Sequence, residues 1–380
     1  MTHSPDASRS LPVLRALIDA VDHEVLELLS RRNGLVAEIA SYKRHHQVAI
    51  RDPRRESEII ADRRARSTPL GLQPDVVESI YRLILWASRD RQASLRAQVP
   101  LDVETKTVAV IGGHGAMGSC IADLFADLGH AVMIADLDTD LSPEEAAREA
   151  DVVVISVPID VTAEVIRRLG PLVRPDALLM DVTSVKTTPV RAMLDASRAA
   201  VVGAHPLFGP SVHSLQGQRV ALVPGRGDDW LAWLRTMLEA RGLNVIDTTA
   251  EAHDRAMAVV QVLTHFTTEV MGSTLAGLGV PLEETLRFTS PVYLMELLMT
   301  ARHFAQSPDL YASIQMSNPE SDRIADAFLE TAQRLRENVA RRDHAAFERV
   351  FREVHDYFGD FTERALAQSS FLIDRLVERT

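Results

Sequence analysis

The stretch "TVAVIGGHGAMGSCIADLF", residues 107–125, constrains the fold of this chain more than any other part of the sequence. It begins with a short apolar segment of strand character and continues through a glycine-rich turn into a helix. Gly113, Gly115 and Gly118 have the spacing G-x-G-x-x-G, which lets the backbone approach a pyrophosphate at a helix N-terminus. Because the turn lies between a strand and a helix, we predict a dinucleotide-binding unit rather than another α/β turn.

A second apolar segment, residues 131–135, ends in Asp136, about 20 residues beyond the glycines. A carboxylate at this position holds the adenosine ribose hydroxyls and repels the 2′-phosphate of NADP. We therefore expect NAD as the cofactor. The predicted cofactor site also includes Met117, Ser156 and Pro158.

Further apolar runs continue the αβ rhythm at residues 151–158, 177–182, 199–206 and 220–225. Continuous apolar runs predict a parallel sheet covered on both faces, whose ligands bind beyond the carboxyl ends of the strands. Those ends carry Ser184, Lys186 and His205. In "GAHPLFGP" the imidazole of His205 could simply cap a turn, but its place at a strand end favours a catalytic acid or base.

Residues 1–100 show no strand-like alternation. Apolar residues from Leu14 to Ile39 recur every three or four positions, which predicts one helix of roughly 30 residues. Asp52 is the expected N-cap of a second helix. Ser88 and Gln92 fall in the apolar stripe of a third, which favours a polar pocket inside a helical bundle. The alternative is a coiled-coil dimerisation arm whose register is set by a polar residue.

The part from residue 249 to residue 380 is helical again, and its apolar spacing predicts one long helix across residues 335–358. The predicted fold is therefore multidomain, with all-α and α/β parts. It has an N-terminal helical module (residues 1–100), a Rossmann-type parallel-sheet domain (105–248) and a C-terminal helical dimerisation domain (249–380).

The net charge is uneven: about +3 over residues 1–100 and about −15 over the rest, within a total of −12. The acidic total argues against nucleic-acid binding, and the basic module could take an anion. One cysteine fits a reducing compartment. The polar first residues lack a signal sequence, and no apolar run is long enough to cross a bilayer. We expect a cytoplasmic protein without membrane or nucleic-acid partners.

The N-terminal stretch resembles the all-helical chorismate mutase module. Its polar residues stand where that family keeps its active-site groups: Arg15, Arg32, Lys43, Asp52, Arg55, Glu56, Ser88 and Gln92. The resemblance implies rearrangement of chorismate to prephenate in an intertwined homodimer, with Arg15 reaching the partner's site. The arginines would clamp two carboxylates, and Lys43 and Gln92 would donate to the ether oxygen. Glu56 would hold the substrate hydroxyl, supported by Asp52 and Ser88.

Residues 105–375 resemble prephenate dehydrogenase through strings such as "DVTSVK", "GAHPLFGP" and "RHFAQSPDLYA". The whole chain is thus similar to the family of bifunctional chorismate mutase/prephenate dehydrogenases of tyrosine biosynthesis. That resemblance implies His205 as the base at the ring hydroxyl and Ser184 as its hydrogen-bonding partner. Lys186 would support the site, and Arg302 would bind the ring carboxylate. By the same resemblance, His253 would contact the substrate, and Tyr311 is a further candidate for its pocket.

One position departs from the family pattern, because Leu294 replaces a positively charged residue. This change puts in doubt how the side-chain carboxylate is held, and with it the preference for prephenate over arogenate and the inhibition by tyrosine. Feedback by tyrosine would act at the dehydrogenase site. His253 and His265 would lie about 120° apart on one α-helix, so we expect no metal site.

Two alternatives remain open. The first is a 3-hydroxy-acid dehydrogenase with an unrelated helical prefix, which would need a catalytic lysine where "RHFAQ" offers an arginine. The second is an inactive mutase module kept for dimerisation and regulation, against which the complete polar set argues.

Overall fold

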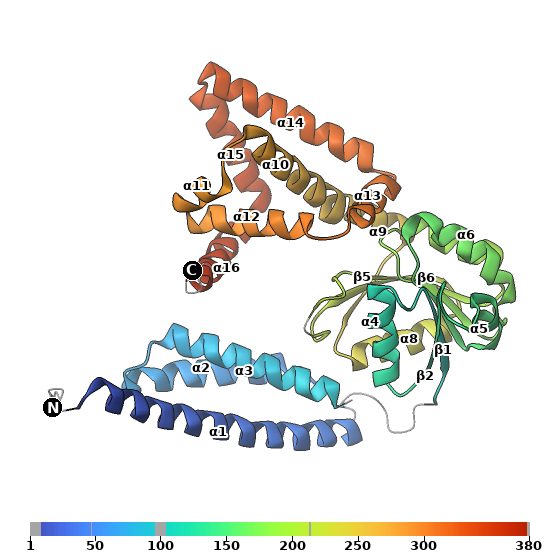
Figure 1. Ribbon diagram of the computed structural model, residues 1–380, viewed down its shortest axis with the longest axis horizontal. Helices are drawn as coiled ribbons and strands as arrows, with labels where there is room; N and C mark the ends of the chain where they lie inside the picture. Colours follow the sequence, from blue (N-terminus) through green and yellow to red (C-terminus); the bar gives the residue numbers. More distant parts are fainter. Residues whose placement is uncertain (1–8, 47, 96–103, 213, 378–380) are drawn as a thin grey trace. The chain divides into compact units, whose positions relative to one another are not determined.

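The computed structural model describes residues 9–46, 48–95, 104–212 and 214–377 (Figure 1). The chain divides into two compact units. The first consists of Met1–Ser156, Arg168–Val182 and Ala196–Asp247, and the second of Val157–Arg167, Thr183–Asp195 and Thr248–Thr380. The outer ends of the predicted domains at residues 1, 100 and 380 lie outside the described residues.

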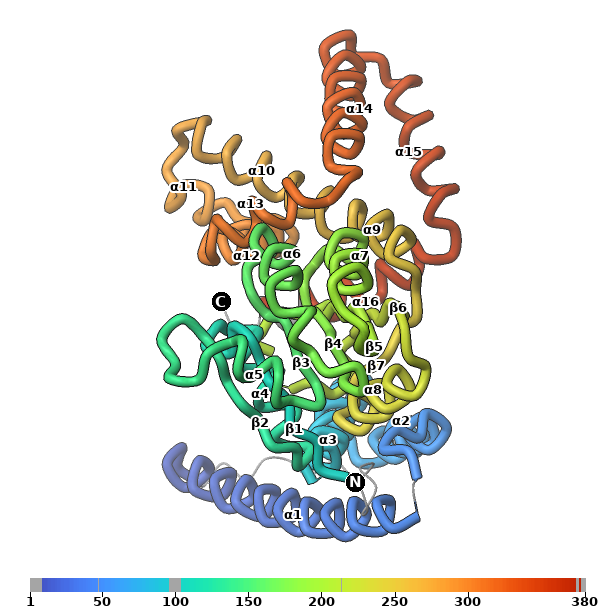
Figure 2. Tube along the Cα trace, turned by 90° about the vertical axis from the view of Figure 1, so that its right-hand side faces the viewer, coloured from blue at the N-terminus to red at the C-terminus, as the bar shows by residue number. Residues whose placement is uncertain are grey.

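The first unit begins with helices, the longest of which is α1, drawn in dark blue in Figures 1 and 2. Asp52 caps the second helix by accepting the backbone N–H of Arg55 at 2.9 Å, and Pro53 is its first residue. Gly71, with φ of +74°, ends the short 3₁₀ turn that follows. These elements are α1 (Leu11–His46), α2 (Pro53–Ser67), η1 (Thr68–Leu70) and α3 (Pro74–Ser94).

The first unit also contains one seven-stranded sheet with the order β2-β1-β3-β4-β5-β6-β7. Neighbouring strands are parallel, except that β6 is antiparallel to β5. The strands are β1 (Thr107–Ile111), β2 (Ala131–Ala135), β3 (Val152–Ile155), β4 (Leu178–Asp181), β5 (Ala200–Pro206), β6 (Arg219–Arg226) and β7 (Asn244–Asp247).

The predicted parallel sheet is thus confirmed for most of its strand pairs, and β6 is the exception. A parallel connection usually runs through a helix, and the described residues between β5 and β6, within 207–218, form none. The core of the sheet is nevertheless the expected one. Val108, Val152 and Val154 are fully buried and pack with Phe125 of α4 and Leu234 of α8. The helices here are α4 (Ala116–Asp127), α5 (Pro143–Glu149), η2 (Gly170–Leu172) and α8 (Asp228–Ala240).

The second unit is helical. Its helices include α6 (Ile159–Leu169) and α7 (Thr187–Ala196), most of whose residues it contains, and then α9 (Ala250–Met257), the π-helix η3 (Ala258–Leu263), α10 (Thr264–Leu278), α11 (Leu282–Arg287), α12 (Pro291–Phe304), α13 (Pro308–Ser317), α14 (Ser321–Arg341), α15 (His344–Phe358) and α16 (Phe361–Val377). Among the described helices, none has the length and apolar character needed to cross a bilayer.

The long helix predicted across residues 335–358 is in fact two helices. Arg342 adopts the left-handed conformation with φ of +52°, which ends α14. Asp343 then caps α15 by accepting the backbone N–H of Ala346 at 2.9 Å. The apolar spacing continues across this turn, so it could not reveal the break.

Candidate functional site

Arg32 of α1 meets Ser88 and Gln92 of α3 inside the N-terminal helices. The Arg32 Nη1 group donates to the Ser88 hydroxyl, and Gln92 Nε2 donates to the backbone carbonyl of Ser88 at 3.1 Å. Ser88 and Gln92 are buried, and Gln92 Oε1 has no hydrogen-bond partner within the described part of the chain. Leaving a buried amide oxygen unpaired costs about 1–3 kcal/mol. The position is therefore suited to a polar ligand.

Lys43 lies near the end of α1 and donates to the backbone carbonyls of Ala49 and Ile50, at 2.9 and 2.6 Å. Burial is the largest influence on its ammonium group and lowers the pKa of Lys43, while the carboxylates of Asp52 and Glu56 oppose that shift. The electrostatic influence of both carboxylates means that the fold brings these three predicted residues near one another.

Glu56 pairs with Arg89 at 2.6 Å, and both side chains are about four-fifths buried, with 22% and 20% of their surface exposed. Arg89 was not predicted from the sequence. The one feature that could have indicated it is its position directly after Ser88, which lies in the apolar stripe predicted for the third helix. Asp52 is occupied as the cap of α2. Arg55 is exposed and lies 3.5 Å from Glu58.

Arg15 is the predicted mutase residue that the fold of one chain keeps apart from the others. It lies on α1 about 25 Å along the helix axis from Arg32, so the two cannot meet within one chain. Arg15 is exposed, and so are the apolar side chains around it, including those of Leu14, Ile18 and Val21.

The glycine turn after β1 forms a tight cradle. Gly112 has φ of +81°, and a Cβ atom at Gly118 would collide with the carbonyl oxygen of Gly112. A Cβ at Gly113 would lie 2.7 Å from Cγ2 of Ile134. α4 begins directly after Gly115, and the first backbone N–H groups of a helix have no acceptor within the helix itself. This geometry fits a pyrophosphate.

Asp136 directly follows β2 and is held in place by two backbone groups. Its Oδ2 atom accepts from the N–H of His114 at 2.9 Å, and Oδ1 accepts from the N–H of Leu137 at 2.8 Å. Ser156 follows the neighbouring β3 and donates its N–H to Ile111 at 2.9 Å. The residues predicted to bind NAD are thus at the carboxyl ends of adjacent strands, while Met117 packs against the core.

His205 lies within β5, not in the turn that follows it, and is buried. The last residue of β4, Asp181, is in register with Gly203, so His205 extends beyond the end of the parallel part of the sheet. Beyond that point His205 pairs only with β6, opposite Ala221. This places its imidazole at the carboxyl edge expected for a ligand site.

Ser184, Lys186 and His253 belong to the second unit. Ser184 is half-buried, Lys186 is fully buried, and both lie in the loop before α7. His253 is buried in α9, and its Nδ1 atom lies 2.8 Å from Oδ1 of Asp254. The same carboxylate accepts the backbone N–H of Lys186 at 2.8 Å. Sequence reasoning did not select Asp254.

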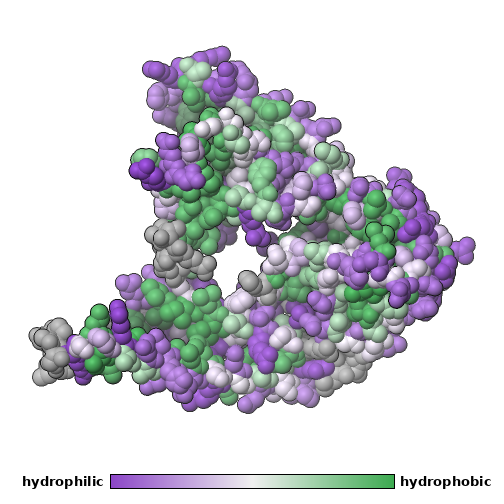
Figure 3. Space-filling view, in the orientation of Figure 1, coloured by the Kyte–Doolittle hydropathy of each residue, from purple (hydrophilic) through white to green (hydrophobic). Residues whose placement is uncertain are grey.

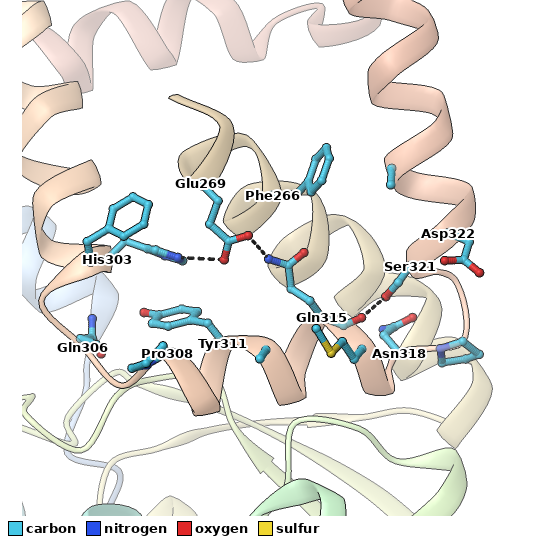
Figure 4. A pocket seen from close by; sticks show the side chains of 15 residues that line it. Phe266, Glu269, His303, Gln306, Pro308, Tyr311, Gln315, Asn318, Ser321 and Asp322 are labelled. Atoms are coloured by element: carbon cyan, nitrogen blue, oxygen red, sulfur yellow. Dashed lines mark hydrogen bonds and ion pairs between the residues drawn. The ribbon is translucent and has the colours of Figure 1, made fainter. Parts of the chain in front are cut away.

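The helices of the second unit also line an open pocket of about 830 Å³ (Figure 4). Glu269 of α10 accepts from Gln315 and lies 3.1 Å from Nε2 of His303. The tilted rings of Tyr311 and His303 are in contact, with 3.9 Å between their centroids, and burial raises the pKa of Tyr311. Arg302 is exposed, yet it is near enough to Tyr311 to act on that pKa in the opposite direction.

His265 contacts Tyr311 edge-on at 4.8 Å, and burial, reinforced by the neighbouring His303, lowers the pKa of His265. The predicted 120° separation of His253 and His265 assumed a continuous α-helix. That assumption was wrong, because the π-helix η3 lies between them and turns less per residue. Within the described residues, no three His, Cys, Asp or Glu side chains are grouped to bind a metal.

Comparison with protein families gives matches to three stretches of the chain. Residues 14–93 match chorismate mutase type II. Residues 123–247 match the nucleotide-binding domain of prephenate dehydrogenase, and residues 249–353 match its dimerization domain. The second match begins after the glycine turn, so the cradle is seen from the structure rather than from that match.

Two relatives are similar along nearly the whole chain. The T-protein of Enterobacter agglomerans is 35% identical over 368 residues, which cover 96% of this chain and 97% of the relative. The T-protein of Haemophilus influenzae is 31% identical, with the same two coverages. A crystal structure of prephenate dehydrogenase from A. aeolicus shares the fold, with a TM-score of 0.55 and 21% identity over 67% of this chain and 98% of that chain.

Proposed function

The chain belongs to the T-protein family, and we propose that each of its two reactions is carried by one of the residue sets described above. It is a bifunctional enzyme of tyrosine biosynthesis. It rearranges chorismate to prephenate, and it oxidises and decarboxylates prephenate to 4-hydroxyphenylpyruvate with NAD. The observation that carries the mutase assignment is the polar cluster of Arg32, Ser88 and Gln92, in which Ser88 and Gln92 are buried.

The rearrangement is intramolecular, so the mutase residues need only to position the substrate and to stabilise the charge that develops in the transition state. Arg32 and Arg55, with Arg15 from the partner subunit, clamp the two carboxylates of chorismate. Lys43 and Gln92 donate to the ether oxygen, where negative charge develops as its bond breaks. Glu56, steadied by Arg89, accepts from the substrate hydroxyl. Asp52 and Ser88 hold the surrounding backbone and guanidinium groups in place.

In the second reaction, NAD supplies the hydride acceptor. His205 removes the proton of the ring hydroxyl while the hydride leaves the carbon that carries it, and the loss of carbon dioxide makes the ring aromatic. Ser184 orients that hydroxyl, Lys186 supports it, and Arg302 holds the ring carboxylate. His253 and Tyr311 contribute further contacts to the substrate. Asp136 holds the adenosine ribose, and Gly113, Gly115, Gly118, Met117, Ser156 and Pro158 form the remainder of the cofactor site.

The apolar surface of α1 supports a homodimer. Many large apolar side chains of this helix are exposed (Figure 3), among them Ile18 at 61% and Leu26 at 64%. A contiguous apolar face of this kind marks a protein interface. A second copy of the chain would cover it and bring its Arg15 to a site that lacks one.

We also propose that tyrosine inhibits at the dehydrogenase site. Tyrosine shares the phenol ring and a side-chain carboxylate with the product, so the two should compete for the same contacts. Tyrosine should raise the KM for prephenate and leave the mutase rate unchanged. Inhibition that lowers kcat alone would contradict a shared site. The use of NAD and the single cysteine support a place in the cytoplasm.

One assay on the purified chain tests both activities. Chorismate should disappear with or without NAD, and NADH should appear when NAD is present. Prephenate supplied directly should give NADH without a lag. Stable chorismate, or prephenate that yields no NADH, would contradict the corresponding assignment.

A further inference from the structure

Asp254 is a buried acidic residue, and its membership of helix α9 does not by itself explain why it is buried. It is 2% exposed and charged, and a buried carboxylate is costly unless it is well paired. Its Oδ1 accepts the backbone N–H of Lys186 at 2.8 Å, and its Oδ2 accepts that of Thr187 at 2.9 Å. Its Oδ1 also lies 2.8 Å from Nδ1 of His253. Every one of these contacts is within the second unit.

The two backbone bonds serve the start of α7. The first N–H groups of a helix have no partner inside the helix, and a negative charge there is stabilised by the helix dipole. α7 begins at Thr187, and Asp254, far away in sequence, supplies the acceptor. The loop that ends at α7 carries Ser184 and Lys186. Asp254 therefore ties that loop directly to the helix that carries His253.

The contact between Asp254 and His253 fixes the orientation of the His253 imidazole ring. With the Nδ1 proton donated to Asp254, the neutral imidazole has its lone pair on Nε2. Burial alone would raise the pKa of Asp254, but the hydrogen bonds from His253, Thr187 and Lys186 outweigh it and lower the pKa to about 2. The carboxylate is thus ionised at neutral pH.

A third segment converges on the same residue. The side-chain Nδ2 of Asn318, at the end of α13, donates to the backbone carbonyl of Asp254 at 2.9 Å. Asn318 is itself buried, and its Oδ1 accepts the N–H of Glu320 at 2.9 Å. α13 carries Tyr311. Segments bearing four proposed substrate residues therefore meet at one aspartate.

We propose that Asp254 is a positioning residue for prephenate oxidation, which fixes the Ser184–Lys186 loop and the His253 ring in their working geometry. The inference rests on the proposed dehydrogenase function. It differs from a purely structural role, because a carboxylate needed only for folding would change stability without changing the kinetics of the folded enzyme. A displacement of about 1 Å at such a site can cost roughly 100-fold in rate.

The test compares Asp254→Asn with the wild type and with Glu251→Gln, which removes an exposed carboxylate from the same helix. Asp254→Asn should lower kcat/KM for prephenate roughly 10- to 100-fold, and this decrease should come from a lower kcat and not from a higher KM. Its mutase activity should stay within about twofold of the wild type, and its circular dichroism spectrum and thermal unfolding curve report on folding of the part that contains Asp254. Glu251→Gln should behave as the wild type in both assays. A folded Asp254→Asn protein with wild-type oxidation kinetics would overturn the proposal.

A double variant separates positioning from independent effects. If Asp254 acts through His253, adding His253→Gln to Asp254→Asn should cost little beyond the larger single effect. Fully additive losses would overturn that link. Failure of the wild type to oxidise prephenate would instead contradict the proposed function itself.

A spectroscopic measurement covers the case in which Asp254→Asn does not fold. Nitrogen-15 NMR of the histidine-labelled wild-type protein, assigned with His253→Gln, should show the His253 ring protonated at Nδ1 when neutral. A ring protonated at Nε2 would overturn the assignment without any Asp254 variant.

Discussion

At the scale of single residues, Lys43 has a property that can be measured. Its role requires the protonated amine, and burial lowers the pKa of Lys43. The mutase rate should therefore fall as the pH rises through a value below the usual lysine pKa of about 10.4. Lys43→Arg keeps its charge at high pH, so its slower mutase reaction should persist further into the alkaline range. The pH profile of kcat/KM for chorismate measures this, and identical alkaline limbs would contradict it.

Asp136 predicts cofactor choice. Its carboxylate would meet the 2′-phosphate of NADP with like charge, so NAD should be favoured at least tenfold, about 1.4 kcal/mol. Asp136→Ser should reduce that preference. Asp138→Ser is the matched control, because Asp138 is an exposed carboxylate two positions on and pairs with His114 at 2.8 Å. Equal kcat/KM for the two cofactors in the wild type would refute the argument.

Residues differ in how much the sequence reveals about them. Ser88 and Gln92 could be selected because each interrupts an apolar stripe, and the structure buries both. Asp254 interrupts no pattern. Its partners Lys186 and Thr187 are remote in sequence, and only the fold brings them together. Arg89 and Glu269 escaped prediction for the same reason, since each is defined by its contact with another helix.

At the scale of elements, local sequence signals predicted where helices and strands begin and end better than they predicted how the strands pair. The strands at residues 107–111 and 131–135 and the start of α2 at Pro53 were predicted as the structure has them, because strand runs and caps are local. The direction of β6 depends on the connection from β5, which apolar content does not encode. β7 is a short strand at the edge of the sheet, and its sequence NVID has too few apolar residues to predict a strand.

α1 carries the prediction that belongs to this scale. One straight helix cannot bring Arg15 to the Arg32 and Lys43 end of itself, so Arg15 should complete the site of a second chain. Arg15→Ala and Lys43→Ala proteins should each have little mutase activity. Mixing them under conditions of subunit exchange should restore some, because a hybrid dimer contains one site with both residues intact. Continued inactivity after exchange has been demonstrated would mean that each chain builds its own site.

At the scale of the whole molecule, the sequence predicted the order of the parts because each part has its own texture: helical periodicity, then αβ rhythm, then helices again. The charge division follows the same boundary, with a basic N-terminal module and an acidic remainder. The division of the chain into two compact units does not follow that boundary, since α6 and α7 belong largely to the unit of the C-terminal helices. Sequence could not reveal that, because these helices lie within the αβ rhythm.

The last prediction concerns the independence of the two reactions. The mutase residues lie between residues 15 and 92, in a helical bundle with its own buried contacts. The proposed base, His205, lies near the end of the inner strand β5, in a sheet that follows the mutase helices in the chain. His205→Ala should lose most NADH production, since removal of a positioned base typically costs about 10²–10⁴-fold, and should still convert chorismate.

Arg32→Ala should show the opposite behaviour. Without this guanidinium, a substrate carboxylate loses both binding and orientation, so chorismate conversion should fall steeply. Prephenate added directly should still be oxidised at close to the wild-type rate. Four rates on two folded, dimeric variants complete the test, with Arg31→Ala as the control for loss of an arginine from the same helix, because Arg31 is exposed. If either variant lost both activities in parallel, the two reactions would have to share a pocket or be strongly coupled, since neither residue contributes chemistry to the other reaction.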